Sequence, residues 1–252
     1  MTEFREITNG LMFPEGPIAM PDGTVILVEI ERQTLTRVHA DGRQEIITQM
    51  AGGPNGAALG PDGKVYVCNN GGFDWTKDDG VNHPTAQAAN YVTGRIERVD
   101  IETGEIETLY TECDGHALCG PNDIVFDAKG NFWFTDLGKS REFDMDRGSV
   151  YYARSDGSMI VRAAHPLMTP NGIGLSPDDS RVYAAETDPR RLIAWDIIGE
   201  GKLATKPWPA ISWGELVMAP EGEKRFDSLA LEANGNICVA TLLTGGITVA
   251  AP

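Results

Sequence analysis

The sequence predicts an all-β protein built as a β-propeller. Short β-like runs recur along the chain, and each of them follows a tight polar turn and lacks the periodicity of a helix. These runs are Thr24–Val28, Lys64–Cys68, Asn131–Thr135, Arg181–Ala185 and Asn236–Ala240. Three of the turns before them contain Asp-Gly or Asn-Gly, which supply the positive φ angles that tight hairpins need.

A repeat of polar residues accompanies these turns. The residue eight positions before the last residue of each turn is Glu, Asn or Asp in every case, and four of the five follow proline. The five positions are Glu15, Asn55, Asn122, Asn171 and Asp227. By subtraction, successive positions are 40, 67, 49 and 56 residues apart. That spacing is typical of four-stranded propeller blades, the longer ones with insertions.

A further strand follows each of the first four runs, and a glycine-containing turn follows that strand. The additional strands are Thr34–Val38, Gly94–Val99, Gly148–Tyr152 and Leu192–Asp196. Hairpins in succession with no long amphipathic segment between them indicate a β-meander and not an α/β fold. The segment 71–91 is polar and irregular. We expect it to be a loop inserted in the second unit that covers the mouth of the central channel.

The repeat also predicts a site. Equivalent positions of successive blades are related by rotation about the propeller axis, so the five residues should form a ring around one end of the channel. Their side chains are short oxygen donors, and two of them are anionic, which is the environment that a hard cation such as Ca²⁺ prefers. An Asn before Gly is also ordinary turn chemistry, but this does not explain Glu15 or Asp227.

Composition limits the remaining possibilities. The 252 residues carry a formal net charge of -16, which disfavours nucleic-acid binding and contact with anionic membranes. The chain has no apolar run long enough for a transmembrane helix and no signal peptide at its start, so we expect a cytoplasmic protein with a single propeller domain over residues 1–252. The four cysteines lack a CxxC pair and are predicted to be small buried hydrophobic residues.

The motifs resemble those of the regucalcin/gluconolactonase family, also called the senescence marker protein, gluconolactonase and luciferin-regenerating enzyme family. The resemblance extends from about Phe13 to Thr241, and its markers are Pro14–Pro17, Gly120–Asp123, Phe134–Asp136, Pro170–Gly172 and Phe226–Ser228. It implies a six-bladed propeller with a divalent cation at its axis, Ca²⁺ or alternatively Zn²⁺, and hydrolysis of lactones. Paraoxonases and phosphotriester-cleaving enzymes have a similar ring.

The resemblance also implies roles for individual residues. Glu15, Asn171 and Asp227 match the family's metal ligands, and Asn122 matches a position that contacts the metal or the substrate. Asp227 matches the proposed catalytic acid or base as well. Ser228 stands where many members have glycine, although drug-responsive bacterial lactonases carry serine there. Secondary candidates for substrate binding are Asn55 and Asp136.

The chain departs from the family pattern at two points. Sugar-lactone members often have Arg two positions before the Asn of the third unit, where this chain has Gly120, so a less polar lactone or ester is expected. Only five units are visible, and the sixth blade is expected to be missing from this chain. The N-terminal segment 4–7, which would normally help to close the ring, has no evident partner strands.

The sequence therefore predicts a small-molecule lactone or ester hydrolase, in which the cation polarises the carbonyl and Asp227 acts as general base. A phosphotriesterase with the same ring is the alternative enzyme. A propeller that binds or buffers calcium without turnover is the alternative outside catalysis, and a strictosidine-synthase-like propeller fits less well because it needs no such cation. His116, six residues before Asn122, is a further candidate at the channel mouth.

Overall fold

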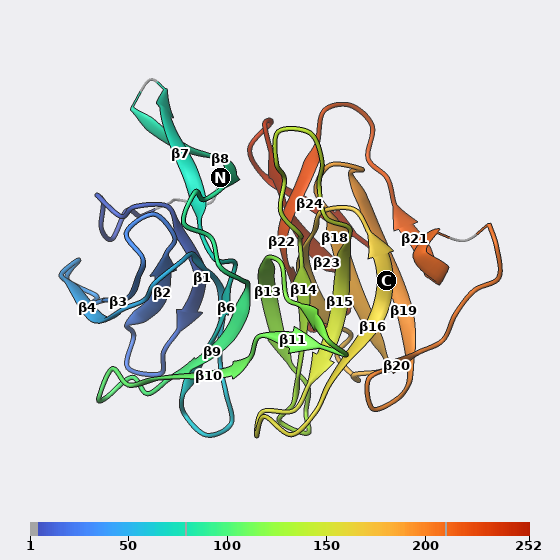
Figure 1. The fold of residues 1–252 in the computed structure, drawn as a ribbon, viewed down its shortest axis with the longest axis horizontal. Coiled ribbons are helices and arrows are strands. Elements are labelled where there is room, and N and C mark those ends of the chain that lie inside the picture. The colour runs from blue at the N-terminus through green and yellow to red at the C-terminus, as the bar shows by residue number, and fades with distance from the viewer. Residues whose placement is uncertain (1–4, 79, 210) are drawn as a thin grey trace.

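A computed structural model of the chain describes residues 5–78, 80–209 and 211–252. The described residues form an all-β propeller with five blades that follow one another in sequence order (Figure 1). The sixth blade and its absence both stay predictions. No helix among the described residues is long and apolar enough to cross a membrane.

The first three blades are antiparallel four-stranded sheets. The first contains β1 (Pro14–Ala19), β2 (Val25–Glu29), β3 (Thr34–Val38) and β4 (Gln44–Gln49). The second contains β5 (Pro54–Leu59), β6 (Val65–Asn69), β9 (Arg95–Val99) and β10 (Ile106–Tyr110). The third contains β13 (Pro121–Phe126), β14 (Phe132–Asp136), β15 (Gly148–Ala153) and β16 (Ile160–Leu167). The short strands β11 (Glu112–Cys113) and β12 (His116–Ala117) connect the second blade to the third.

The last two blades are less regular. The fourth contains β17 (Pro170–Leu175), β18 (Arg181–Glu186) and β19 (Arg191–Gly199), and two strands pair with β19, namely β20 (Lys202–Leu203) and β21 (Glu215–Met218). A short 3-10 turn, Ile211–Trp213, precedes β21. The fifth contains β22 (Arg225–Leu231), β23 (Ile237–Leu242) and β24 (Ile247–Ala250). All the strands that the sequence predicted are therefore confirmed, with ends that differ by a few residues.

The prediction of an irregular loop at 71–91 was wrong. The segment contains a β-hairpin of β7 (Phe73–Asp78) and β8 (Val81–Gln87), with Gly80 at positive φ in its turn. In Figure 1 the hairpin projects from the body of the propeller. Most of its side chains are exposed on both faces, so the sequence lacks the alternation of apolar and polar residues by which a half-buried strand is recognised.

The hydrophobic core lies between successive blades. Each pair of neighbouring blades encloses one cluster of buried side chains, such as Trp133 and Trp195 between the third and fourth blades. The innermost strands β1, β5, β13, β17 and β22 contact one another in this order. Gly172 allows this close approach, because a Cβ there would lie 2.6 Å from the carbonyl oxygen of Asp227. The inner strands therefore gather the repeated polar residues around one axis.

Two further predictions concern the N-terminal segment, which was expected to lack partner strands, and the burial of the cysteines. Residues 5–11 form no strand; Thr8 donates a hydrogen bond to the carbonyl of Gly42 in the first blade, and Phe4 lies outside the described residues. All four cysteines are free, as predicted, but only Cys68 and Cys113 are buried. Cys119 and Cys238 are partly exposed.

Candidate functional site

The five repeated residues occupy equivalent places in the five inner strands. Glu15, Asn55, Asn122 and Asn171 are the second residues of their strands, and Asp227 is the third residue of β22. In each strand the pairing register shifts immediately after the first pairs, which indicates a β-bulge at or beside the repeated residue. Bulges re-aim side chains near active sites. The repeat that the sequence showed is therefore also a repeat of backbone geometry.

Burial and charge set the properties of the two acidic members of this ring. Burial, together with the neighbouring carboxylates of Asp227 and Asp123, raises the pKa of Glu15 to about 8. Burial also raises the pKa of Asp227, while hydrogen bonds from the Asn171 side chain and the Ser228 backbone oppose this shift. Glu15, Asn171 and Asp227 therefore converge, although they come from the first, fourth and fifth blades.

Asp123 is an acidic residue of this site that sequence reasoning missed. Burial raises its pKa to about 7, and Asp227 contributes to the shift in the same direction, whereas a hydrogen bond from the Ser228 side chain lowers it. The available signal was the motif itself, because Pro121-Asn122 is followed by Asp where three of the other four units have Gly. Ser228 thus lies between two carboxylates of the site.

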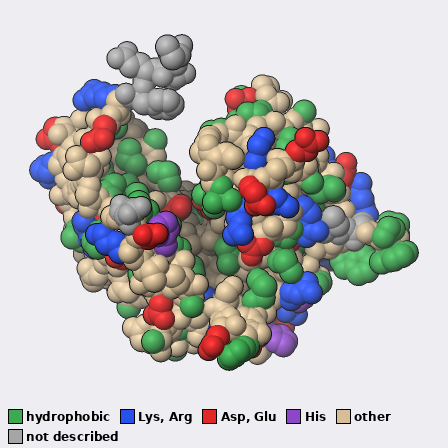
Figure 2. Space-filling view, turned by 90° about the horizontal axis from the view of Figure 1, so that it is seen from above, with side chains coloured by type: hydrophobic (Ala, Val, Ile, Leu, Met, Phe, Trp, Pro, Cys, Tyr) green, Lys and Arg blue, Asp and Glu red, His purple; other side chains and the backbone are tan. Residues whose placement is uncertain are grey.

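The asparagines of the ring are buried. Asn55, Asn122 and Asn171 expose only 7%, 7% and 8% of their surface. Figure 2 shows that the molecule is hollowed on the face that carries the β7–β8 hairpin. Amide oxygens can act as ligands of a cation or as hydrogen-bond acceptors for a substrate.

The chemistry of this donor set fits a divalent cation. Within the described residues, Glu15, Asp123 and Asp227 form no ion pair with Lys or Arg, so three acidic groups share one buried region without a counter-ion. The described residues contain no group of three His, Cys, Asp or Glu side chains arranged for a metal. A cation here would accordingly need the asparagine oxygens as well as carboxylates, which suits a hard ion.

Asp136 lies in a different environment from the ring. It is buried at the end of β14 and accepts hydrogen bonds from the backbone amides of Cys119, Gly120 and Gly138, at 2.7, 2.6 and 2.9 Å. Other blades repeat this arrangement: Glu29 accepts from the amide of Met12, and Glu186 from that of Met168. Each of these side chains thus holds the loop that leads into an inner strand.

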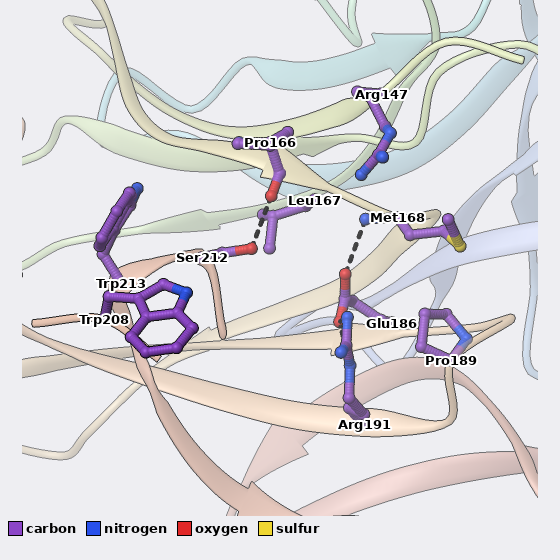
Figure 3. A pocket seen from close by; sticks show the side chains of 10 residues that line it. All are labelled: Arg147, Pro166, Leu167, Met168, Glu186, Pro189, Arg191, Trp208, Ser212 and Trp213. Carbon is purple, nitrogen blue, oxygen red and sulfur yellow. Dashed lines mark hydrogen bonds and ion pairs between the residues drawn. The ribbon is translucent and has the colours of Figure 1, made fainter. Parts of the chain in front are cut away.

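Two peripheral cavities contain none of the repeated residues. One, of about 470 Å³, lies between the third and fourth blades and is bordered by Met168, Trp208 and Trp213 (Figure 3). The other, of about 350 Å³, lies on the outer part of the third blade and contains His116. His116 therefore lines a cavity away from the ring, and its predicted place at the channel mouth is not supported by its neighbours.

Curated proteins similar to this chain include lactonases. The chain is 26% identical to lactonase drp35 from Staphylococcus saprophyticus over 247 residues, which are 97% of this chain and 68% of the relative. It is 25% identical to a gluconolactonase from Zymomonas mobilis over 208 residues, 74% of this chain and 52% of the relative. The chain thus spans between about half and two thirds of the length of these relatives.

Solved structures support the fold. A gluconolactonase from Xanthomonas campestris superposes with a TM-score of 0.69 at 20% identity, covering 96% of this chain and 76% of that one. A calcium-binding regucalcin from Agrobacterium tumefaciens gives 0.67 at 18% identity, covering 95% and 70%. The family model described as the SMP-30/gluconolactonase/LRE-like region matches residues 13–252. The chain therefore belongs to the SMP-30/gluconolactonase/LRE-like family.

Proposed function

We propose that this protein hydrolyses a lactone with the help of one divalent cation. Ca²⁺ is the proposed ion, and Zn²⁺ is the alternative. The observation that carries the proposal is the convergence of Glu15 and Asp227 with buried asparagines and no neutralising side chain. Glu15, Asn122, Asn171 and Asp227 would hold the cation. When bound, it would polarise the lactone carbonyl and stabilise negative charge on its oxygen.

The chain's own residues would supply the proton transfer. Asp227 would accept a proton from water as the water oxygen adds to the carbonyl carbon, after which the ring C–O bond breaks and the proton passes to the leaving alkoxide. The product is a hydroxycarboxylate. The hydrogen bond from the Asn171 side chain to Asp227 favours one orientation of the carboxylate for this step.

Substrate positioning would fall to Asn55, Asn122 and Ser228. Asn55 and Asn122 present amide groups from neighbouring inner strands, and Ser228 presents a hydroxyl next to Asp227. The oxygens of Asp136 are already bonded to three backbone amides. Its contacts therefore favour a role in holding the Cys119–Gly120 loop over direct contact with the substrate.

The position of Gly120 supports a substrate that is less polar than a sugar lactone. A Cβ at this residue would lie 2.5 Å from the carbonyl oxygen of Gly138, which is backbone and cannot rotate away. An arginine that could contact sugar hydroxyls would thus require the loop to move. We expect aromatic or alkyl lactones to be turned over with higher kcat/KM than gluconolactone.

The test is a lactone panel assayed with metal-stripped protein, with and without restored Ca²⁺, Zn²⁺ or Mn²⁺. The expected result is turnover that disappears on stripping and returns with one of these ions. The matched control is metal-stripped protein to which Mg²⁺ and the same counter-anion are added, because Mg²⁺ prefers a near-ideal octahedral shell with several waters. Turnover that is unaffected by stripping would contradict the cation's role, and metal binding without turnover of any lactone would favour a non-catalytic cation-binding propeller.

A second candidate activity is hydrolysis of a phosphotriester by the same site. The specific observation in its favour is 31% identity to diisopropyl-fluorophosphatase from Loligo vulgaris over 157 residues, 58% of this chain and 48% of the relative. Including a fluorophosphonate and a phosphotriester in the same panel decides between the two activities, because the ratio of kcat/KM values identifies the preferred reaction.

The cytoplasmic location of the protein stays a prediction.

A further inference from the structure

The outer cavity of the third blade has an unusual charge for this protein. Arg147 and Arg162 both line it, together with His116 and His165, whereas the whole chain has a net charge of -16. Its floor and walls come from the segment before β13 and from β14, β15 and β16. Two guanidinium groups thus bring positive charge to one cavity of an otherwise acidic molecule.

Both arginines lack an intramolecular partner in the part of the chain that the structure describes. Eleven other arginines there form ion pairs with Asp or Glu. Neither Arg147 nor Arg162 lies within ion-pair distance of a carboxylate, and neither side chain donates a hydrogen bond among these residues. Arg147 also lines the neighbouring cavity drawn in Figure 3, where no bond joins it to the other labelled residues. Their donors are thus available to a ligand.

The acidic groups of the cavity are already engaged. The carboxylate of Asp136 accepts three backbone hydrogen bonds, and that of Asp146 is bonded by the Arg141 side chain, at 2.8 and 3.0 Å, and by the Lys139 amide. Burial raises the pKa of the Cys119 thiol to about 12, so this group adds no negative charge at neutral pH. Arg141 therefore neutralises Asp146, and backbone amides satisfy the oxygens of Asp136, whereas the two arginines have no such partner among the described residues.

Ser149 and His165 complete the polar wall. The hydroxyl of Ser149 lies 3.0 Å from Nδ1 of His165, and the same nitrogen lies 3.1 Å from the carbonyl oxygen of Gly148. The imidazole is therefore held through Nδ1, and Nε2 is the ring nitrogen left for a ligand.

We propose that this cavity is a second binding site, which takes a small oxyanion, a carboxylate or a phosphate, between Arg147 and Arg162. Guanidinium groups bind both kinds of anion through paired N–H donors, and the pairing is stronger where the protein supplies no competing carboxylate. The site shares no residue with the ring at the propeller axis. The proposal therefore does not depend on lactone hydrolysis.

Isothermal titration calorimetry of the metal-stripped full chain at low ionic strength tests this site, with inorganic phosphate and malonate as the two probes. Removal of the metal prevents binding of the probes to a cation at the axis. We expect saturable binding of one equivalent of at least one probe, and the tighter probe identifies the class of anion. Absence of saturable binding of both probes would overturn the proposal.

Paired variants separate a specific site from general electrostatics. The variant Arg147→Gln/Arg162→Gln should bind at least about tenfold more weakly, which corresponds to 1.4 kcal/mol. The control Arg154→Gln/Arg190→Gln removes the same charge from two partly exposed arginines that pair with Glu200 and Glu223, and it should bind like the wild type. Equal losses in both variants would overturn the proposal. Arg147→Lys/Arg162→Lys should recover part of the affinity, and its circular dichroism should match that of the wild type.

Discussion

At the scale of single residues, the site is defined by acidic side chains that are largely removed from water and lie close to one another. Burying a carboxylate without a counter-ion costs free energy, and two or three such groups together cost more because they repel each other. The raised pKa values of Glu15, Asp123 and Asp227 are the consequence in the metal-free protein. A bound cation would reverse this cost, which is the reason to expect metal-dependent stability as well as activity.

Replacement of Asp227 tests the general base. Asp227→Asn keeps the shape of the side chain but removes its basicity, so kcat should fall by about 100-fold or more. The measurement is steady-state hydrolysis of the best lactone at saturating cation. The matched control is Asp41→Asn, in an exposed turn of the first blade, where the amide oxygen can still accept the hydrogen bond from Arg43. Unchanged kcat in Asp227→Asn would remove this residue from the mechanism.

Replacement of Glu15 tests the cation site by two opposite effects. Glu15→Gln removes one of the repelling carboxylates, so the metal-free protein should have a higher Tm than the wild type. It also removes an anionic ligand, so cation affinity should fall by about tenfold or more, and added Ca²⁺ should raise Tm less. Differential scanning calorimetry with and without Ca²⁺ measures both effects. A variant with wild-type affinity for the cation would show that Glu15 is not a ligand.

At the scale of elements, a buried lysine of the third blade contacts the start of the β7–β8 hairpin. Lys139 donates hydrogen bonds to the side-chain oxygen of Asn70, at 3.1 Å, and to the carbonyl of Gly72, at 2.8 Å, and its ammonium lies 3.9 Å from the centre of the Phe73 ring. The hairpin also packs Trp75 on Phe13, two residues before Glu15, with ring centres 5.1 Å apart. The insertion therefore contacts the loop that leads into the first inner strand.

This buried lysine predicts a pH-dependent stability. Burial lowers the pKa of Lys139 from 10.5 to about 7, so above pH 7 the folded protein has released a proton that the unfolded chain still holds. Stability relative to a Lys139→Met variant should consequently rise with pH between about 7 and 9, by at most about 1.4 kcal/mol per pH unit. Urea unfolding of both proteins at several pH values measures the difference. Parallel curves for the two proteins would show that Lys139 does not titrate in this range.

At the scale of the whole molecule, the ring depends on how closely the blades approach one another. Gly172→Ala places a methyl group 2.6 Å from both the carbonyl oxygen of Asp227 and the amide nitrogen of Leu229, and these backbone atoms cannot move without shifting β22. We expect a loss of stability of about 1–3 kcal/mol and weaker cation binding. The control is Gly199→Ala in β19, whose Cβ would meet its nearest atom at 3.6 Å. Equal stability of both variants would contradict this account of the blade contacts.

The sequence by itself determined the blades and the ring. Tight turns at regular positions and the residue eight positions before each turn are local properties, so they can be read along the chain and hold in the structure for Glu15, Asn122 and Asp227 alike. That residues 1–252 form a single domain stays a prediction from the sequence. The coarse family and the candidate ligands were therefore within reach of sequence reasoning.

Only the tertiary structure decided which polar residues share an environment. Asp123 joins the acidic site because β13 packs beside β5 and β17. Asp136, by contrast, accepts hydrogen bonds from backbone amides, two of which belong to the loop before β13. The sequence also did not predict the hairpin at 73–87 or the cavity of Arg147 and Arg162, since both depend on contacts between separate segments. The pattern of turns and strands along the sequence predicts the secondary structure. The contacts of a side chain, however, depend on how the blades pack against one another.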